Sequence, residues 1–115
     1  MNDHVQSVNF RRGLLPLIVL QLLQDRDMYG YQIVQEAGRR SQGRIITQEG
    51  SLYPVLYRLL KEKYISEEKV PRGEKMVRVV YHLEERGKEY LKTLIEEYDF
   101  ISQGMNLILG RETNL

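Results

Sequence analysis

Two segments near the start of the chain have the apolar spacing of helices. The run LLPLIVLQLL predicts a core helix from about Leu14 to Gln24, in which Pro16 falls in the first turn, where backbone N–H groups have no helical partner. A second helix is predicted from about Tyr29 to Arg40, because its apolar residues recur on one face: Tyr29, Ile33, Val34 and Ala37. The polar stretch DRD between them predicts a turn.

A third helix is predicted after the segment RIITQEG. Its apolar residues recur at helical spacing: Leu52, Val55, Leu56, Leu59 and Leu60. The opposite face carries Gly50, Pro54, Tyr57, Arg58 and Lys61. Because a proline does not fit deep inside a regular helix, this helix either begins near Gly50 or Ser51, which we prefer, or kinks at Pro54.

A β-hairpin is predicted next. YISEEKV (64–70) is one candidate strand, PRGEK (71–75) is the turn, and MVRVVYHL (76–83) alternates between two faces. One face carries Val77, Val79, Tyr81 and Leu83, and the other carries Met76, Arg78, Val80 and His82. We expect the tip and outer face of this hairpin to be basic, through Arg72, Lys75 and Arg78.

The last predicted helix is the longest, at about Glu84 to Leu109, with Gly87 and Gly104 favouring fraying at its ends. Its apolar residues follow a heptad pattern, with Leu91, Tyr98 and Met105 at one position and Leu94, Ile101 and Ile108 at the other. Such a seam packs against another helix, either the first helix of this chain or the same helix of a second copy. Because the helix is too long for so small a domain to cover, the pattern favours a homodimer.

The order of these elements is typical of a winged helix-turn-helix protein, mainly α with a small β-hairpin. In that fold the third helix lies in the major groove of DNA, and the hairpin reaches the backbone or the minor groove. We expect residues 1–83 to form a DNA-binding domain with residues 1–10 as an N-terminal arm, and residues 84–115 to form a C-terminal dimerisation helix.

The charge distribution agrees with this interpretation. The 115-residue chain has a net charge of only +1, but residues 1–83 hold 13 Lys and Arg against 9 Asp and Glu, a balance of +4. Residues 84–115 hold 4 against 7, a balance of −3. The front of the chain is therefore suited to a polyanion such as double-stranded DNA.

Other classes of function lack the residues that they need. There is no cysteine, and His4 and His82 have no partner at metal-ligand spacing, so we expect no metal and no cofactor. The acidic runs DRD, SEEK and LEER are typical of turns and helix starts, so we expect no enzyme. The longest apolar run is about half of the ~20 residues that a membrane-spanning helix needs. We expect a cytoplasmic protein.

Four stretches of the sequence resemble the PadR-like family of transcriptional regulators: RGLLPLIVLQLL, MYGYQI, EGSLYPVLYRL and VRVVYHLEERGKEYL. The resemblance covers about residues 12–95, and MYGY followed by GSLYP about twenty residues later is its most specific part. It implies a dimeric winged helix-turn-helix protein, usually a repressor. The single C-terminal helix resembles the smaller subfamily, and the resemblance implies a response to small aromatic or drug-like molecules.

Two positions depart from the pattern of the family. The usual YxLTxxG before the last helix is YHLEERG here, so Glu84 replaces a capping Thr and a preferred N-cap is lost. Multidrug-responding relatives carry a Trp in the dimerisation helix, where this chain has Tyr98 and no Trp anywhere.

The residues that we expect to contact DNA come from three elements. The second and third helices supply Tyr29, Gly50, Ser51, Tyr57, Arg58 and Lys61, and the hairpin supplies Arg72, Lys75 and Arg78. Arg11 and Arg12 are candidate backbone contacts of the arm. The alternative for Ser51 is helix capping, and for the cations it is a solvated surface. Tyr53 is expected to pack, with a solvated hydroxyl.

The expected dimer interface consists of Leu91, Leu94, Tyr98, Ile101, Met105 and Ile108. Within it, Tyr98, Ile101 and Met105 either line a pocket for a flat aromatic effector or form a plain packed interface. The predicted function is a dimeric repressor of a palindromic operator, released by such an effector. The alternative is a winged-helix module that binds a protein and not DNA.

Overall fold

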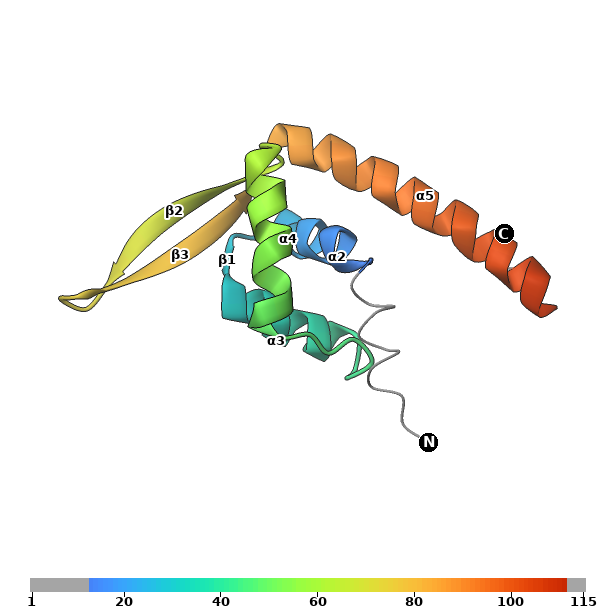
Figure 1. Cartoon of the computed structure of the whole chain (residues 1–115), viewed down its shortest axis with the longest axis horizontal. Helices are drawn as coiled ribbons and strands as arrows, with labels where there is room; N and C mark the ends of the chain where they lie inside the picture. The colour runs from blue at the N-terminus through green and yellow to red at the C-terminus, as the bar shows by residue number, and fades with distance from the viewer. Residues whose placement is uncertain (1–12, 112–115) are drawn as a thin grey trace.

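A computed structural model describes residues 13–111, so the arm and its Arg11 and Arg12 lie outside the described residues. The elements in chain order are α2 (Leu15–Asp25), β1 (Met28–Tyr29), α3 (Gly30–Arg40), α4 (Glu49–Lys61), β2 (Ile65–Arg72), β3 (Met76–Leu83) and α5 (Glu85–Leu109). This is the predicted winged helix-turn-helix with a long last helix. The wing, β2 with β3, and α5 extend in opposite directions from the three packed helices (Figure 1).

The core lies where α2, α3 and α4 meet the base of the wing. It consists of the predicted apolar stripes, with Leu15, Val19, Leu20, Leu22, Leu23, Ile33, Ala37, Leu52, Val55, Leu56 and Leu59 all buried. Ile65, Tyr81 and Leu83 close it from the sheet, and Leu91 closes it from α5. Burial of these apolar side chains is the main force that holds the helices together.

The sheet has three strands, in the order β1-β3-β2, where the sequence predicted two. The added strand β1 pairs antiparallel with β3, with Met28 opposite Tyr81 and Tyr29 opposite Val80. The prediction placed Tyr29 in the second helix, which begins at Gly30 instead. A two-residue strand has no periodicity of its own, because its partner lies some fifty residues away in the sequence.

The third predicted helix begins slightly earlier than expected. It starts at Glu49, one residue before Gly50, so the expected start near Gly50 or Ser51 holds to within one or two residues, but Pro54 lies inside α4 and not within its first turn. Pro54 is exposed, so its ring does not disturb the core. The carbonyl of Gly50 loses its usual i+4 donor because proline has no N–H.

The wing joins α5 through tight packing around Tyr64. Its ring stacks on that of Tyr90 at 4.2 Å between centroids, and the Arg86 guanidinium lies 4.9 Å from the Tyr64 ring centroid. Glu84 makes no side-chain cap, as the sequence predicted, and its carboxylate accepts a hydrogen bond from the Ser66 hydroxyl at 2.5 Å. These contacts fix the direction in which α5 leaves the domain.

Gly87 contradicts the predicted fraying at the start of α5. It is buried, and a Cβ at this position would lie 2.1 Å from the Tyr64 carbonyl oxygen and 2.6 Å from Leu83 Cδ1. The glycine therefore permits a close approach of α5 to the base of the wing.

Candidate nucleic-acid interface

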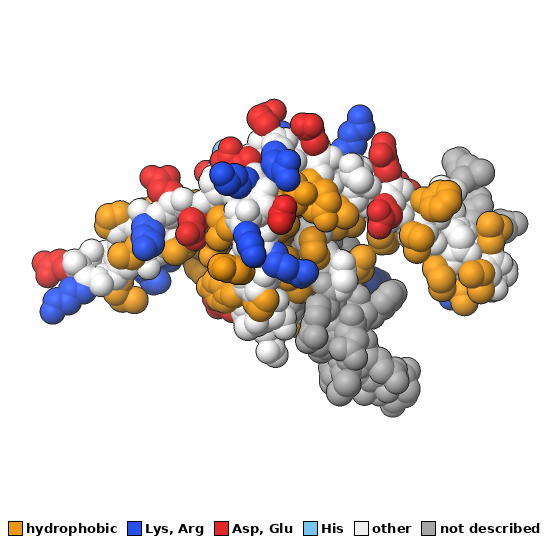
Figure 2. Space-filling view, turned by 45° about the horizontal axis from the view of Figure 1, so that its top comes forward, with side chains coloured by type: hydrophobic (Ala, Val, Ile, Leu, Met, Phe, Trp, Pro, Cys, Tyr) orange, Lys and Arg blue, Asp and Glu red, His pale blue; other side chains and the backbone are white. Residues whose placement is uncertain are grey.

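The outward face of α4 is exposed, as the helical pattern predicted. Gly50, Pro54, Tyr57, Arg58 and Lys61 all lie on the surface, and Tyr57 is 67% exposed. Lys and Arg side chains gather over this part of the molecule (Figure 2). Among the described residues Arg58 and Lys61 form no ion pair, so their charges are available to a ligand.

Ser51 is half-buried and is the third residue of α4. The N-cap is Gln48, so the capping role that was the alternative for Ser51 is not what the structure shows. It lies about one turn before Pro54 and nearly two turns before Tyr57, near the start of α4.

Tyr53 connects the two helices of the helix-turn-helix. A Cβ on Gly30 would lie 3.0 Å from the Tyr53 hydroxyl oxygen, so α3 and α4 approach closely there. That hydroxyl donates to Glu49 Oε2 at 2.9 Å. Partial burial and the Glu49 carboxylate raise the pKa of Tyr53 above its usual value. Tyr53 therefore packs beside Gly30 but is still 46% exposed, and its hydroxyl, expected to be solvated, is bound to Glu49.

The wing carries Arg72 and Lys75 as exposed cations near its tip, as predicted. Arg78 differs, because it is half-buried and its guanidinium lies over the ring of Tyr29, 4.3 Å from Cζ to the centroid. The expectation that Arg78 lies on an open outer face is therefore wrong. Sequence reasoning missed this pair because β1, which brings Tyr29 beside β3, was not predicted.

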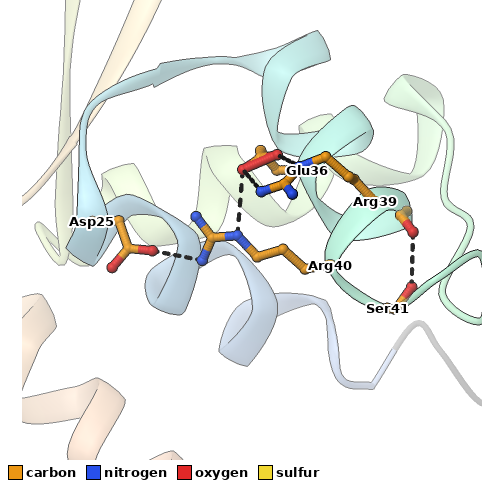
Figure 3. Close-up of polar contacts among 6 residues, drawn as sticks. Asp25, Glu36, Arg39, Arg40 and Ser41 are labelled. Carbon is orange, nitrogen blue, oxygen red and sulfur yellow. Dashed lines mark hydrogen bonds and ion pairs between the residues drawn. The ribbon is translucent and has the colours of Figure 1, made fainter.

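The end of α3 holds a different kind of arginine. Arg39 and Arg40 both bond to Glu36, and Arg40 also reaches Asp25 at the end of α2 (Figure 3). The hydrogen bond from Arg39, supported by the charges of both arginines, lowers the pKa of Glu36 to about 2. Both arginines are occupied by carboxylates: Arg39 pairs within α3, and Arg40 also holds the end of α3 to the end of α2.

The predicted seam of α5 is divided between two environments. Leu91 is buried in its own domain and Leu94 packs against that core, so neither offers much surface to a partner. Tyr98, Ile101, Met105 and Ile108 are between 46% and 79% exposed. Apolar side chains gather on this end of α5 (Figure 2). Only the C-terminal half of the seam is therefore free.

A groove of about 270 Å³ lies between α2 and α5. Its lining includes Tyr98 and Ile101 together with Pro16, Leu17 and Tyr90, but not Met105. Of the three candidate effector residues, the structure thus brings two together. Sequence reasoning also missed Phe100 and Leu107, which are 76% and 72% exposed and lie seven residues apart on the side of α5 away from the seam.

Residues 13–111 show neither a metal site nor a membrane-spanning helix. No group of three or more His, Cys, Asp or Glu there could hold a metal ion. Within the same residues no helix is long and apolar enough to cross a membrane.

Comparison with known proteins gives consistent matches. The model of the transcriptional regulator PadR-like family matches residues 19–93. A Lysinibacillus sphaericus protein named uncharacterized protein X is 32% identical over 98 residues, 85% of this chain and 90% of that protein. A PadR family transcriptional regulator from Eggerthella lenta is 27% identical and has a TM-score of 0.79, covering 97% of this chain and 96% of its own.

A further solved structure shows the same fold. PadR of Bacillus subtilis, in complex with operator DNA, is 24% identical, with a TM-score of 0.66 over 71% of this chain and 46% of that chain.

Proposed function

Because the chain belongs to the PadR-like family of DNA-binding transcriptional regulators, we propose that it acts as a homodimeric repressor of a palindromic operator. In each subunit α4 enters the major groove and the wing contacts the flanking backbone. The observation that carries this proposal is the exposed outer face of α4, where Arg58 and Lys61 have no acidic partner among the described residues.

The remaining expected contacts divide by their chemistry. Gly50 lets the backbone of α4 approach the DNA closely, since the space beside its Cα is open. Ser51 and Tyr57 can donate hydrogen bonds to phosphates or base edges. Arg72 and Lys75 extend the basic surface along the wing. Lys and Arg release counterions when they bind phosphates, so affinity is expected to fall steeply with salt.

The free half of the α5 seam supports a homodimer. Ile101, Met105 and Ile108 are large, apolar and more than 40% exposed, and contiguous apolar surface of this kind is typical of an interface. A two-fold dimer presents its two α4 helices to half-sites about 10 base pairs apart or a multiple of that.

Release by a small aromatic or drug-like effector is proposed for the groove between α2 and α5. Tyr98 can stack on a flat ring, and the groove is lined mainly by apolar side chains. An effector bound there would touch the element that carries the dimer seam, and so could change the distance between the two α4 helices.

The experiment that tests DNA recognition begins with a duplex enriched from random DNA by the full chain. Fluorescence anisotropy then compares that duplex with a scrambled one at about 50 and 200 mM salt. Tight, sequence-preferring binding that weakens with salt is the expected result. Failure to enrich any sequence, or equal affinity for the scrambled duplex, would overturn the proposal.

The effector is tested by thermal unfolding of the full chain with a panel of planar aromatic compounds. A ligand that binds the native state raises the midpoint. The expected result is a rise that Tyr98→Ala abolishes, together with weaker operator binding when the compound is present. A flat profile across the panel would leave the seam as a plain packed interface.

A further inference from the structure

Arg78 is held in place by aromatic rings. Its Cζ lies 4.3 Å from the centroid of Tyr29 and 5.9 Å from that of Tyr31. The two tyrosine rings are nearly parallel, at 6°, with centroids 6.5 Å apart. Tyr29 pairs with Val80 across the strands, so Arg78, two residues earlier on β3, is its diagonal neighbour on the same face of the sheet. The cation is therefore oriented before any ligand arrives.

The charge of Arg78 is not neutralised within the described part of the chain. Arg39, Arg40 and Arg86 each have a carboxylate partner, whereas Arg78 takes part in none of the ion pairs found there. Its Nε is buried and has no hydrogen-bond acceptor. The rest of the guanidinium has no ion pair among the described residues, so an oriented and unneutralised fork of N–H donors points to a ligand that supplies an acceptor.

A hollow of about 240 Å³ opens beside this arginine. It lies between the start of α3, the start of α4 and the wing, and it is lined by Tyr29, Gly30, Tyr31, Glu49, Tyr53, Arg72, Val77, Arg78, Val79 and Tyr81. Because β1 ends at Tyr29, the edge of β3 from Met76 to Val79 has no partner strand on this side. The hollow is thus open to a group that arrives from outside.

The charges around the hollow favour an anion. Among the lining residues two are arginines, Arg72 and Arg78, and one is a carboxylate, Glu49, which accepts the hydrogen bond of Tyr53 and forms no ion pair with either arginine. Phosphate oxygens match the planar donor fork of a guanidinium, and stacking on aromatic rings leaves that fork free. A phosphate group therefore fits this site better than a carboxylate-rich or apolar ligand.

We propose that this hollow is a phosphate subsite, in which Arg78 binds one backbone phosphate of DNA and Tyr29 positions Arg78. The inference rests on the proposed function, since it places the DNA backbone between α4 and the wing. The backbone passes there when α4 lies in the major groove. Tyr29 acts through its ring and not through its hydroxyl, which differs from the role that the sequence suggested for it.

The test measures affinity for the enriched duplex and the slope of log affinity against log salt. Arg78→Ala is expected to weaken binding about tenfold or more and to lower the slope by about one unit, since one phosphate contact is lost. Arg78→Lys keeps the charge and the slope but still weakens binding. An ammonium group neither binds a phosphate through two parallel hydrogen bonds nor stacks on an aromatic ring. Lys75→Ala, the matched change at an exposed wing cation, is expected to weaken binding by less than about threefold.

Tyr29 is tested by a pair of variants. Tyr29→Phe keeps the ring and is expected to bind within about twofold of the wild type, whereas Tyr29→Leu weakens binding about fivefold with an unchanged salt slope. Circular dichroism checks that each variant is folded. If Arg78→Ala does not fold, Arg78→Lys and the two Tyr29 variants still test the phosphate subsite. The inference is overturned if Arg78→Ala or Arg78→Lys binds like the wild type, or if Tyr29→Phe is as weak as Tyr29→Leu.

The source of the phosphate is tested separately, by thermal unfolding with inorganic phosphate or adenosine monophosphate. If either stabilises the wild type but not Arg78→Ala, and Arg78→Ala still binds DNA normally, the site serves a free phosphate compound and the assignment to DNA is wrong. Weaker DNA binding by Arg78→Ala supports the assignment. If the wild type itself prefers no sequence, the proposed function fails, which is a different outcome from the failure of this subsite alone.

Discussion

Single side chains at two positions decide how the elements meet. Gly87 allows α5 to lie against the backbone of Tyr64, and Glu36 within α3 pairs with Arg39 and Arg40, the second of which also bonds to Asp25 at the end of α2. Neither residue lies on the exposed face of α4. Both are therefore expected to affect the stability of the domain before they affect DNA binding.

Gly87→Ala is expected to lower the free energy of unfolding by about 1–3 kcal/mol, because a Cβ placed 2.1 Å from the Tyr64 carbonyl oxygen forces the backbone to shift. Urea unfolding followed by circular dichroism measures the loss. Gly104→Ala is the matched control, since a Cβ there meets nothing within 4 Å. The control should be unchanged or gain about 0.5–1 kcal/mol from helix propensity, and equal losses in both variants would contradict the argument.

Glu36 makes part of the stability of the folded domain depend on pH. Its pKa is about 2 in the folded chain against an ordinary 4.5, so the carboxylate form is favoured by folding. The stabilisation is fully present above pH 4.5 and is lost as the pH falls towards 2. Glu36→Gln should therefore unfold at a lower temperature than the wild type near neutral pH, with a difference that shrinks in acid.

Thermal unfolding across this pH range measures that difference. Glu96→Gln on α5 is the control, since Glu96 takes part in none of the ion pairs found among the described residues. A difference between Glu36→Gln and the wild type that stays constant down to pH 2 would show that the carboxylate is not the source.

At the scale of elements, α4 and the wing carry the exposed cations Arg58, Lys61, Arg72 and Lys75. The stripe that α4 buries and the face that it exposes are set by the same helical repeat, so burying Leu52, Val55 and Leu56 presents Tyr57 and Lys61 outward. Contacts of that exposed face with phosphates raise affinity without reading sequence, whereas contacts with base edges select a sequence.

Lys61→Ala is expected to weaken binding to the enriched and the scrambled duplex by a similar factor, and to lower the salt slope by about one unit. Lys88→Ala is the matched control, because Lys88 lies on α5 and pairs with Glu85. Anisotropy titrations at several salt concentrations measure both. A change confined to the enriched duplex would assign Lys61 to a base edge and not to a phosphate.

At the scale of the whole molecule, the domain measures 57 × 36 × 21 Å because α5 runs far past the core that it helps to cover. Its first turns pack against the core of the same chain, where Gly87 and Leu91 are buried. Its last turns expose apolar side chains. A single chain has nothing among its described residues to cover that surface, which is the basis of the proposed dimer.

Ile101→Glu is expected to convert the dimer to a monomer, because a carboxylate would be buried without a partner in the interface. Gln103→Glu adds the same charge on the opposite side of α5 and is expected to leave the dimer intact. Sedimentation equilibrium measures the association constants. A wild-type chain that is monomeric at micromolar concentration, or equal effects of the two changes, would contradict the proposed interface.

The periodic pattern of apolar and polar residues was enough to determine the helices, the hairpin, the buried stripe of α4 and its exposed face with Arg58 and Lys61. Each of these depends on neighbours within a few residues, and burial selects the face that the period defines. The family motifs carried the expectation of a DNA-binding regulator, which the family match confirms. The same family match speaks against the alternative function, a winged-helix module that binds a protein and not DNA.

Contacts between residues far apart in the sequence were decided only by the tertiary structure. The strand β1 exists because Met28 and Tyr29 meet β3, and the same pairing carries Arg78 from an expected open surface onto an aromatic ring. Gly87 is a close-packing residue because Tyr64 lies beside it, and Leu91 belongs to its own core because α5 crosses α2. A periodic pattern specifies which face of an element is buried, but the identity of what buries it depends on how the chain folds back on itself.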